Sequence, residues 1–316
     1  MLHLQHLKPI CSARRFCVAD DRLVIHMEIT FWGVRGSFPV SSPHCAQYGG
    51  NTPCIEVNAG DTCLVIDAGT GIYSLGKRLV EQGQKEIHLL ISHTHWDHIH
   101  GFPYFAPLCE SDVTIHLYAL ANANASLKDI LCGQQQEPFF PDALDSVNAD
   151  LHFTDLSEGQ SWNIGPIDVQ CRRLNHASYT GGFRLESVGK TFSYLSDLDL
   201  YGPRLHGEGM NTGSEDEIEQ KRIGLQQNAL ELARDADLMV FDSFFLTEEY
   251  KDDWGHSKME DALRLGAEAN ARRIAFFHHA PGRSDDQLDE LVADYSTKVH
   301  RDADLIAATE GDQIVL

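Results

Sequence analysis

The sequence is poor in positive charge. It has 25 lysines and arginines against 47 aspartates and glutamates, which gives a formal net charge of −22 over 316 residues. A general basic surface for gripping nucleic acid is therefore excluded, and a phosphate ligand would need a local positive centre. The chain also lacks any apolar run near the ~20 residues that a membrane helix needs. Its 42% hydrophobic content is that of a globular protein and excludes a disordered chain.

The eight cysteines form no C-x-x-C pair and no disulfide-framework spacing. We interpret them as buried thiols of a reducing cytoplasm. Residues 1–26 lack the continuous apolar stretch and the cleavage site of a signal peptide. We therefore expect a cytoplasmic protein with an N-terminal extension over residues 1–26 and one folded domain over residues 27–316.

Short β-rich runs alternate with amphipathic segments along the rest of the chain, which is typical of a layered α/β fold. Strand pairs occur between the helical segments, and this order suggests two sheets flanked by helices. The expected strands are 28–34, 53–58, 62–67, 86–92, 113–119, 167–174, 182–188, 191–196, 237–242, 273–277 and 305–309.

Two serines are spaced as helix caps ahead of apolar stripes. Ser257 precedes Glu260 by three residues, and Ser284 precedes Gln287 by three, which is the spacing of a capping box. The acidic stretch 204–222 is interpreted as a surface loop or flap that leads into a further helix over residues 223–234.

Histidine is abundant, with seventeen in the chain. His93, His95, Asp97 and His98 lie within six residues, directly after the apolar strand 86–91. Alternate side chains at a strand end let His93 and His95 converge on one metal ion, while Asp97 and His98 face a neighbouring one. Imidazole and carboxylate ligands suit zinc or manganese. The segment therefore predicts a metal site.

The H-x-H-x-D-H pattern of this segment resembles the signature of the metallo-β-lactamase superfamily. Further matches follow at expected strand ends: His176 resembles the superfamily's third histidine, and Asp197 its bridging aspartate. Residues 65–71 resemble its D-x-G-x-G turn, in which Asp67 would brace the ligands by hydrogen bonding. The resemblance spans residues 28–316.

Two histidines compete for the last ligand position of that superfamily. His278 and His279 both follow the expected strand 273–277, and we favour His278 because it comes first off the strand. His100 is expected to be a supporting or structural residue beyond the cluster. No role is assigned to the histidines at positions 3, 6, 26, 44, 88, 116, 152, 206 and 300.

The resemblance implies a four-layer αββα sandwich that holds two divalent ions per chain, zinc or manganese. The first ion would be held by His93, His95 and His176, and the second by Asp97, His98 and His278, with Asp197 bridging. An aspartate at the bridging position argues for a two-metal hydrolase and against a true β-lactamase, which usually has cysteine there.

Other turns resemble the phosphodiesterase branch, which contains transfer-RNA 3′ processing nucleases and cyclic phosphodiesterases. Residues 254–257 resemble its extra histidine loop, so His256 is expected to act in catalysis alongside the ligand Asp97; the alternative is a capping-loop residue. The turns holding Arg35 and Asn51 also match the branch. Arg35 would clamp a substrate phosphate or pair with an acidic neighbour, and Asn51 would contact substrate.

These features predict a phosphodiesterase for small phosphodiesters such as cyclic nucleotides. Aromatic residues in 102–105 and 138–141 would line a substrate pocket or belong to the core. The alternatives are an RNase Z-like nuclease, which the low basic charge disfavours, and a lactonase or thioesterase. A flavodiiron-type protein and a non-catalytic scaffold fit less well. We expect no stable nucleic-acid partner and no membrane association, and a homodimer by analogy with the branch.

Overall fold

The computed structural model describes residues 26–121, 125–207, 209–300 and 302–316. Apart from residue 26, the expected N-terminal extension lies outside the described residues. Among the described residues, no helix combines the length and apolar character needed to cross a membrane.

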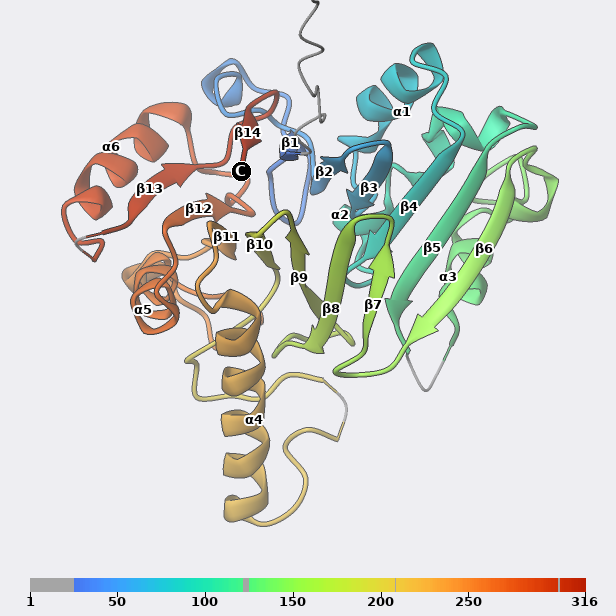
Figure 1. Cartoon of the computed structure of the whole chain (residues 1–316). Coiled ribbons are helices and arrows are strands. Elements are labelled where there is room, and N and C mark those ends of the chain that lie inside the picture. Colours follow the sequence, from blue (N-terminus) through green and yellow to red (C-terminus); the bar gives the residue numbers. More distant parts are fainter. Residues whose placement is uncertain (1–25, 122–124, 208, 301) are drawn as a thin grey trace, which may run out of the picture.

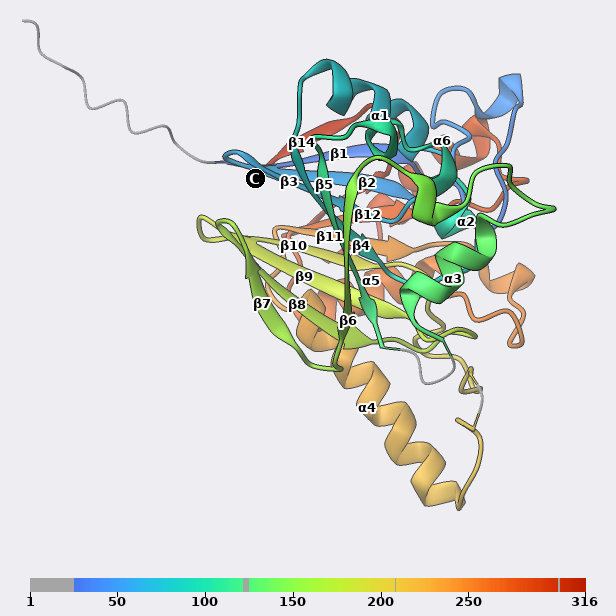
Figure 2. The same ribbon diagram turned by 90° about the vertical axis from the view of Figure 1, so that its right-hand side faces the viewer.

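Two seven-stranded sheets face each other and form the centre of the molecule (Figure 2). In spatial order, the first sheet contains β14 (Gln313–Val315), β1 (Met27–Gly33), β2 (Cys54–Ala59), β3 (Thr62–Ile66), β4 (Glu86–Ile91), β5 (Thr114–Leu120) and β6 (Asp150–Leu156). The second contains β13 (Asp304–Ala307), β12 (Arg273–Phe277), β11 (Leu238–Asp242), β10 (Lys190–Leu195), β9 (Gly181–Ser187), β8 (Ile167–Arg173) and β7 (Ser161–Ile164).

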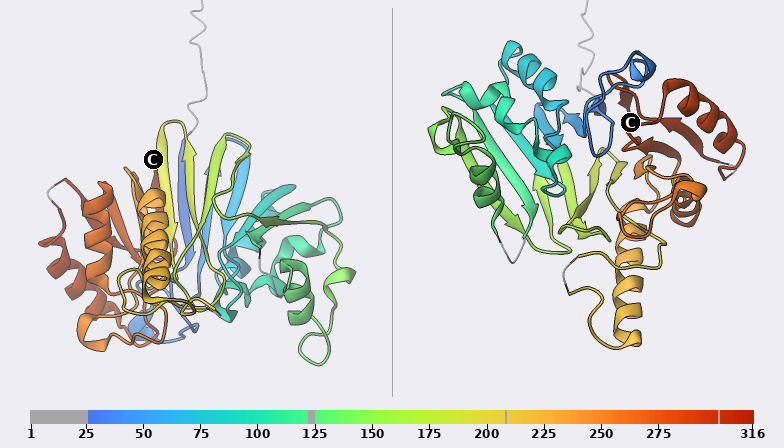
Figure 3. Two further views of the ribbon diagram at one scale, coloured as in Figure 1. Left: turned by 90° about the horizontal axis from the view of Figure 1, so that it is seen from below. Right: turned by 180° about the vertical axis from the view of Figure 1, so that it is seen from behind.

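Helices cover the outer face of each sheet (Figures 1 and 3). The first sheet carries α1 (Ile72–Glu81), α2 (Trp96–Ile99) and α3 (Leu127–Gln134), and the second carries α4 (Glu215–Ala233), α5 (Met259–Ala269) and α6 (Asp285–Ser296). One apolar cluster fills the space between the sheets. A further cluster lies between the first sheet and its helices, and another between the second sheet and its helices. This is the predicted four-layer αββα sandwich.

The expected strands are all present, but β6, β7 and β14 were not predicted. β6 carries polar and half-exposed side chains along most of its length, and β14 has only three residues. Both lie at an edge of the first sheet, where one flank of a strand is free and the sequence needs less apolar character. β7 is likewise a short edge strand of the second sheet.

One predicted helix start and one predicted cap residue were wrong. Helix α4 begins at Glu215 rather than at residue 223, because Ser214 and Glu217 cap each other's backbone N–H groups. Ser257 is not a helix cap. Its buried hydroxyl donates to the carbonyl of Leu198 at 2.6 Å and accepts the N–H of Leu200 at 3.2 Å. The predicted capping pair Ser284 and Gln287 is confirmed.

Strand direction fixes where a site can form. β3 and β4 are parallel in the first sheet, as are β10, β11 and β12 in the second. Their carboxyl ends meet at one end of the sandwich, so the loops that follow them come together there. Parallel strands commonly place functional residues at this end.

Candidate metal centre

The structure brings together all seven predicted metal ligands, which come from loops far apart in the sequence. They follow β4, β8, β10 and β12. Within each group the candidate ligand atoms all lie within 4.8 Å of one another: His93, His95 and His176 form the first group, and Asp97, His98, Asp197 and His278 form the second.

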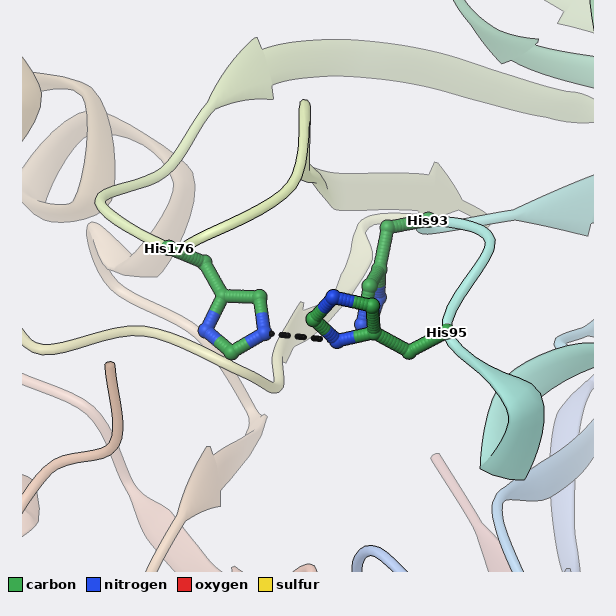
Figure 4. Close-up of side chains that lie close together, drawn as sticks. All are labelled: His93, His95 and His176. Atoms are coloured by element: carbon green, nitrogen blue, oxygen red, sulfur yellow. Dashed lines mark hydrogen bonds between the residues drawn. The ribbon is translucent and has the colours of Figure 1, made fainter. Parts of the chain in front are cut away.

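The three histidines of the first group point toward one another (Figure 4). Nε2 of His176 lies 3.1 Å from Nδ1 of His95. Nδ1 of His176 lies 2.7 Å from the carbonyl oxygen of Gly255, so this nitrogen carries the proton and Nε2 keeps its lone pair for the group. His93 and His176 are buried and His95 is exposed, which leaves the group open to solvent on the side of His95.

The second group combines carboxylates with imidazoles. Nε2 of His278 lies 3.1 Å from Oδ2 of Asp97 and 3.4 Å from Nε2 of His98. The backbone N–H of Ser37 donates to the same Asp97 oxygen at 2.7 Å and fixes its direction. Although burial opposes ionisation, His98 and His278 hold the pKa of Asp97 far below its usual range, so this side chain is a carboxylate.

Asp197 lies between the two groups and presents one oxygen to each. Its Oδ1 lies 3.8 Å from Nε2 of His93 and 3.7 Å from Nε2 of His176. Its Oδ2 lies 3.0 Å from Nε2 of His98 and 3.3 Å from Nε2 of His278. A carboxylate in this position can bind both ions of a pair.

The donor atoms of these two groups are better placed to bind divalent metal ions than to form hydrogen bonds with one another. Among the described residues, the buried Nε2 of His93 has no hydrogen-bond partner, and its 3.8 Å separation from Asp197 is too long for one. Burial lowers the pKa of His93, and it lowers the pKa of His176 to about 3, so both rings are neutral and offer lone pairs. Nitrogen and carboxylate donors in this number are typical of zinc and similar ions.

Asp67 lies behind the candidate ligand His98 and accepts four hydrogen bonds. Its two oxygens accept the N–H and hydroxyl of Ser92, Nδ1–H of His98 and the hydroxyl of Tyr194, at 2.6 to 2.8 Å. The bond to His98 turns the Nε2 of that ring toward the centre. The sequence reasoning missed Tyr194, because a tyrosine in a buried strand gives no signal of such a role.

The structure separates the two neighbouring histidines that follow β12. His278 faces the centre, whereas Nε2 of His279 donates to the carbonyl of Ala308 at 2.9 Å on the other side. The ring of His279 packs edge-on against Tyr48. His278 is therefore the residue of the pair placed to bind metal. His100 is exposed, packs on Trp96 and does not reach either group.

His256 lies beside the two groups, and its partner is a residue that the sequence reasoning missed. Its Nδ1 lies 2.8 Å from Oδ2 of Asp242, which ends β11, and its ring stacks on Phe244. Burial disfavours the imidazolium, but Asp242 and then Asp197 outweigh this and raise the pKa of His256 to about 9. Asp242 could have been identified from the sequence, because it is an acidic residue at the end of an apolar strand.

Arg35 and Asn51 are held in the protein framework. The guanidinium of Arg35 is fully buried and donates to the carbonyls of Gly49 and Arg283, at 2.7 and 2.6 Å. The side chain of Asn51 is bonded to Glu310 and Thr70. Neither side chain is directed at the metal centre, which favours the structural alternative for Arg35.

A cavity of about 710 Å³ opens beside the metal centre. Two of its lining residues contact the site: the backbone N–H of Ser37 donates to Asp97, and Phe244 stacks on His256. Its remaining lining includes the residues Phe245, Glu248, Glu249, Lys251, Trp254, Arg283 and Gln287.

The aromatic segments that the sequence offered as pocket walls do not line this cavity. Phe102 and Phe105 are buried in the core beneath α1. Phe140 lines a separate, smaller cavity, and Phe139 is exposed. The core alternative therefore holds for Phe102 and Phe105, whereas Tyr104 is exposed and packs against Phe140.

Comparison with known proteins agrees with this geometry. Residues 62–211 match the family model described as a Beta-lactamase superfamily domain. The chain is 25% identical to a ribonuclease Z of Haloarcula marismortui over 84% of this chain and 90% of that protein, and 20% identical to one of Pyrococcus furiosus over 81% and 87%.

Solved structures with the same fold extend the comparison. YhfI, described as a metallo-beta-lactamase fold protein of Bacillus subtilis, aligns with a TM-score of 0.66 at 17% identity, covering 92% of this chain and all of that chain. The short form of human tRNase Z aligns with a TM-score of 0.59 at 17% identity, over 91% of this chain and 98% of that chain. The chain therefore has the metallo-β-lactamase fold, and it is a metal-dependent hydrolase.

Proposed function

We propose that the protein is a two-metal phosphodiesterase that hydrolyses small phosphodiesters such as cyclic nucleotides. The observation that carries the proposal is the position of Asp197, with one oxygen toward each ligand group and His256 close by. Two ions about 3.5–4 Å apart are the usual arrangement for in-line displacement at phosphorus. The similarity to ribonuclease Z proteins, which is spread over most of the chain, supports the same bond type.

In this proposal the three histidines of the first group hold one ion, and Asp97, His98 and His278 hold the other. Zinc or manganese bound there would lower the pKa of water and neutralise charge on the phosphoryl oxygens. The chain's own residues keep these ligands in place: Asp67 orients His98, and Ser37 orients Asp97.

His256 would supply a proton on the side of the leaving group. Its Nδ1–H donates to Asp242, which leaves Nε2–H for a phosphoryl oxygen or the departing oxygen. Burial opposes the charge on His256, but the carboxylate of Asp242 raises its pKa and favours the protonated ring. A protonated histidine also stabilises an anionic substrate, which supplies the local positive centre that the acidic chain needs.

The cavity beside the centre would hold the organic part of the substrate. Its volume lies within the ~300–1,000 Å³ range of small-molecule sites. Phe244, Phe245 and Trp254 offer aromatic surface for a flat base, and Lys251 lies 4.3 Å from the centre of the Trp254 ring. These features support a nucleotide-sized substrate.

A ribonuclease Z-like activity is the second candidate, because ribonuclease Z proteins of several organisms match most of the chain. The net charge of −22 argues against it, since RNA binding depends on contacts from lysine and arginine to phosphates. A lactonase or thioesterase would use the same ions on a carbonyl group, but it would leave His256 without a clear task.

The experiment that separates these functions is a substrate panel. Metal-loaded protein is tested on 2′,3′- and 3′,5′-cyclic nucleotides, a precursor transfer RNA, a lactone and a thioester. We expect turnover of the cyclic nucleotides, and a Trp254→Ala variant with a raised KM for them. Cleavage of the precursor RNA alone would instead establish the nuclease, and turnover of the carbonyl substrates alone would reject phosphodiester chemistry.

A further inference from the structure

Three histidines outside the catalytic end of the sandwich lie side by side on neighbouring strands. Strands β4, β5 and β6 lie side by side (Figure 1). In this parallel ladder His88 is in register with His116, and His116 with His152. The rings of His88 and His116 stack with centroids 4.8 Å apart, and those of His116 and His152 are 5.1 Å apart. The proposed function uses none of these residues.

A carboxylate joins two of these rings. Oε1 of Glu86 lies 3.3 Å from Nε2 of His116 and 3.8 Å from Nε2 of His88. The ligand atoms of the three residues all lie within 4.8 Å of one another. A hydrogen bond can form between Glu86 and His116, but the 3.8 Å separation between Glu86 and His88 is too long for one. Hydrogen bonding therefore leaves Nε2 of His88 without a contact to Glu86. An ion with bonds of about 2.1 Å to nitrogen and oxygen would serve all three donors.

The neighbouring side chain of Tyr118 favours metal binding through Nε2 of His88. Its Nδ1 lies 3.2 Å from the hydroxyl of Tyr118, and a ring that donates from Nδ1 keeps the lone pair of Nε2. The side chain of His88 is 14% exposed and that of Glu86 is 66% exposed, so the cluster is anchored on one side and open to solvent on the other. Water could complete the coordination of an ion there.

This cluster is separate from the catalytic centre. His88 precedes His93 by five residues, of which the stretch up to Ile91 is extended strand at ~3.3 Å per residue, so His88 lies roughly 10 Å before the end of β4. His88 also lies within β4, whereas the catalytic ligands begin after that strand ends.

We propose that Glu86, His88 and His116 form an additional site for one divalent transition-metal ion, with zinc the best fit to two imidazoles and a carboxylate. The ion joins β4 to β5 and stabilises the strand that leads into the catalytic loop. The site is independent of which ester the enzyme hydrolyses.

The test is the number of zinc ions per full-length chain after equilibrium dialysis against micromolar Zn²⁺, measured by elemental mass spectrometry. We expect Glu86→Ala and His116→Ala each to bind one ion fewer than the unaltered protein. His152→Ala is the matched control, because this ladder residue pairs with Asp150 outside the cluster and its loss should leave the zinc content unchanged.

Thermal unfolding supplies a second measurement on the same proteins. Added zinc should raise the melting temperature of His152→Ala more than that of Glu86→Ala, whose altered side chain is exposed and does not threaten folding. Equal zinc content and equal zinc-induced shifts in Glu86→Ala, His116→Ala and the unaltered protein would overturn the proposal.

Discussion

Three site residues share an uncommon backbone conformation. Asp67, Asp197 and His278 have φ angles of 63°, 57° and 58°, at or just after the ends of β3, β10 and β12. The left-handed region is sparsely used by residues other than glycine, and holding it costs of order 1–3 kcal/mol. The turn directs each side chain off its strand and toward the centre, so local strain at these positions serves ligand placement.

Asp197 is the residue on which both ligand groups depend. Asp197→Asn removes the negative charge that faces four histidines and leaves an amide that cannot bind two cations. We expect the metal content to fall by at least one ion per chain and turnover to fall at least ~10³-fold, in line with the several kcal/mol that metal ions contribute to charge stabilisation. Metal analysis and steady-state kinetics measure both. Full metal content with full activity would contradict the bridging role.

The partnership of His256 and Asp242 predicts a change in pH dependence. Because Asp242 helps to raise the pKa of His256 to about 9, the proton donor is present below that pH and is lost above it. Asp242→Asn removes the raising charge, so the alkaline limb of the kcat profile should move to lower pH. An unchanged alkaline limb would show that His256 is not the titrating donor.

The residue types and their order allowed the ligand positions to be predicted, but the hydrogen-bonding partners behind them could not be. Histidines and aspartates at strand ends are visible in the sequence because polar residues there have no packing role. Tyr194 and Asp242 act through side chains that meet the site only after distant strands pair. The choice between His278 and His279 likewise depends on which face of β12 meets the centre.

At the scale of elements, a loop from the first sheet positions a ligand of the second. The segment after β1 runs beside the end of β12, where the N–H of Gly36 donates to the carbonyl of His279 at 3.0 Å. A Cβ atom on Gly36 would lie 2.3 Å from Nδ1 of His278, closer than real contacts permit. The absence of a side chain at Gly36 is therefore what lets His278 face the centre.

Gly36→Ala should therefore displace His278, because the three atoms nearest to the added Cβ all belong to that ring. We expect the variant to bind one ion fewer than the unaltered protein and to lose most of its activity. Gly133→Ala is the matched control, because a Cβ there meets nothing within 4 Å. If Gly36→Ala kept both ions of the metal centre, the loop would have moved to accommodate the methyl group, and the packing of Gly36 against His278 would not determine the position of that ligand.

Elements with a run of buried apolar residues, such as β11 and β12, were predicted correctly from the sequence. Those that it missed or shifted depend on their neighbours. β6 needs β5 to pair with, and Ser257 looks like a cap until the loop after β10 folds onto it and binds its hydroxyl. Patterns over a few residues do not contain this information.

At the scale of the whole molecule, the metal centre ties the two sheets together. Its candidate ligands follow β4 in the first sheet and β8, β10 and β12 in the second. Most of these side chains are buried and direct their donor atoms toward one another. An ion that binds only the folded chain stabilises it by about 2.7 kcal/mol when the free ion concentration is 100 times the dissociation constant.

Removal of the ions should consequently lower the melting temperature. With an unfolding entropy of about 2.1 cal/mol/K per residue, we expect a chain of this size to lose roughly 4 °C per ion removed. Calorimetry with and without a chelator measures it, and restored zinc or manganese should reverse the shift. Identical melting curves would show that the centre does not bind metal in the folded protein.

In the proposed mechanism a metal pair and His256 together hydrolyse a phosphodiester. This mechanism is tested most directly by steady-state hydrolysis of bis-p-nitrophenyl phosphate by the metal-loaded protein and by His256→Ala, with the metal content of both determined. We predict turnover that falls ~10²–10⁴-fold in the variant while its metal content stays at that of the unaltered protein. No turnover by the fully loaded protein, or equal turnover in the two proteins, would contradict the account.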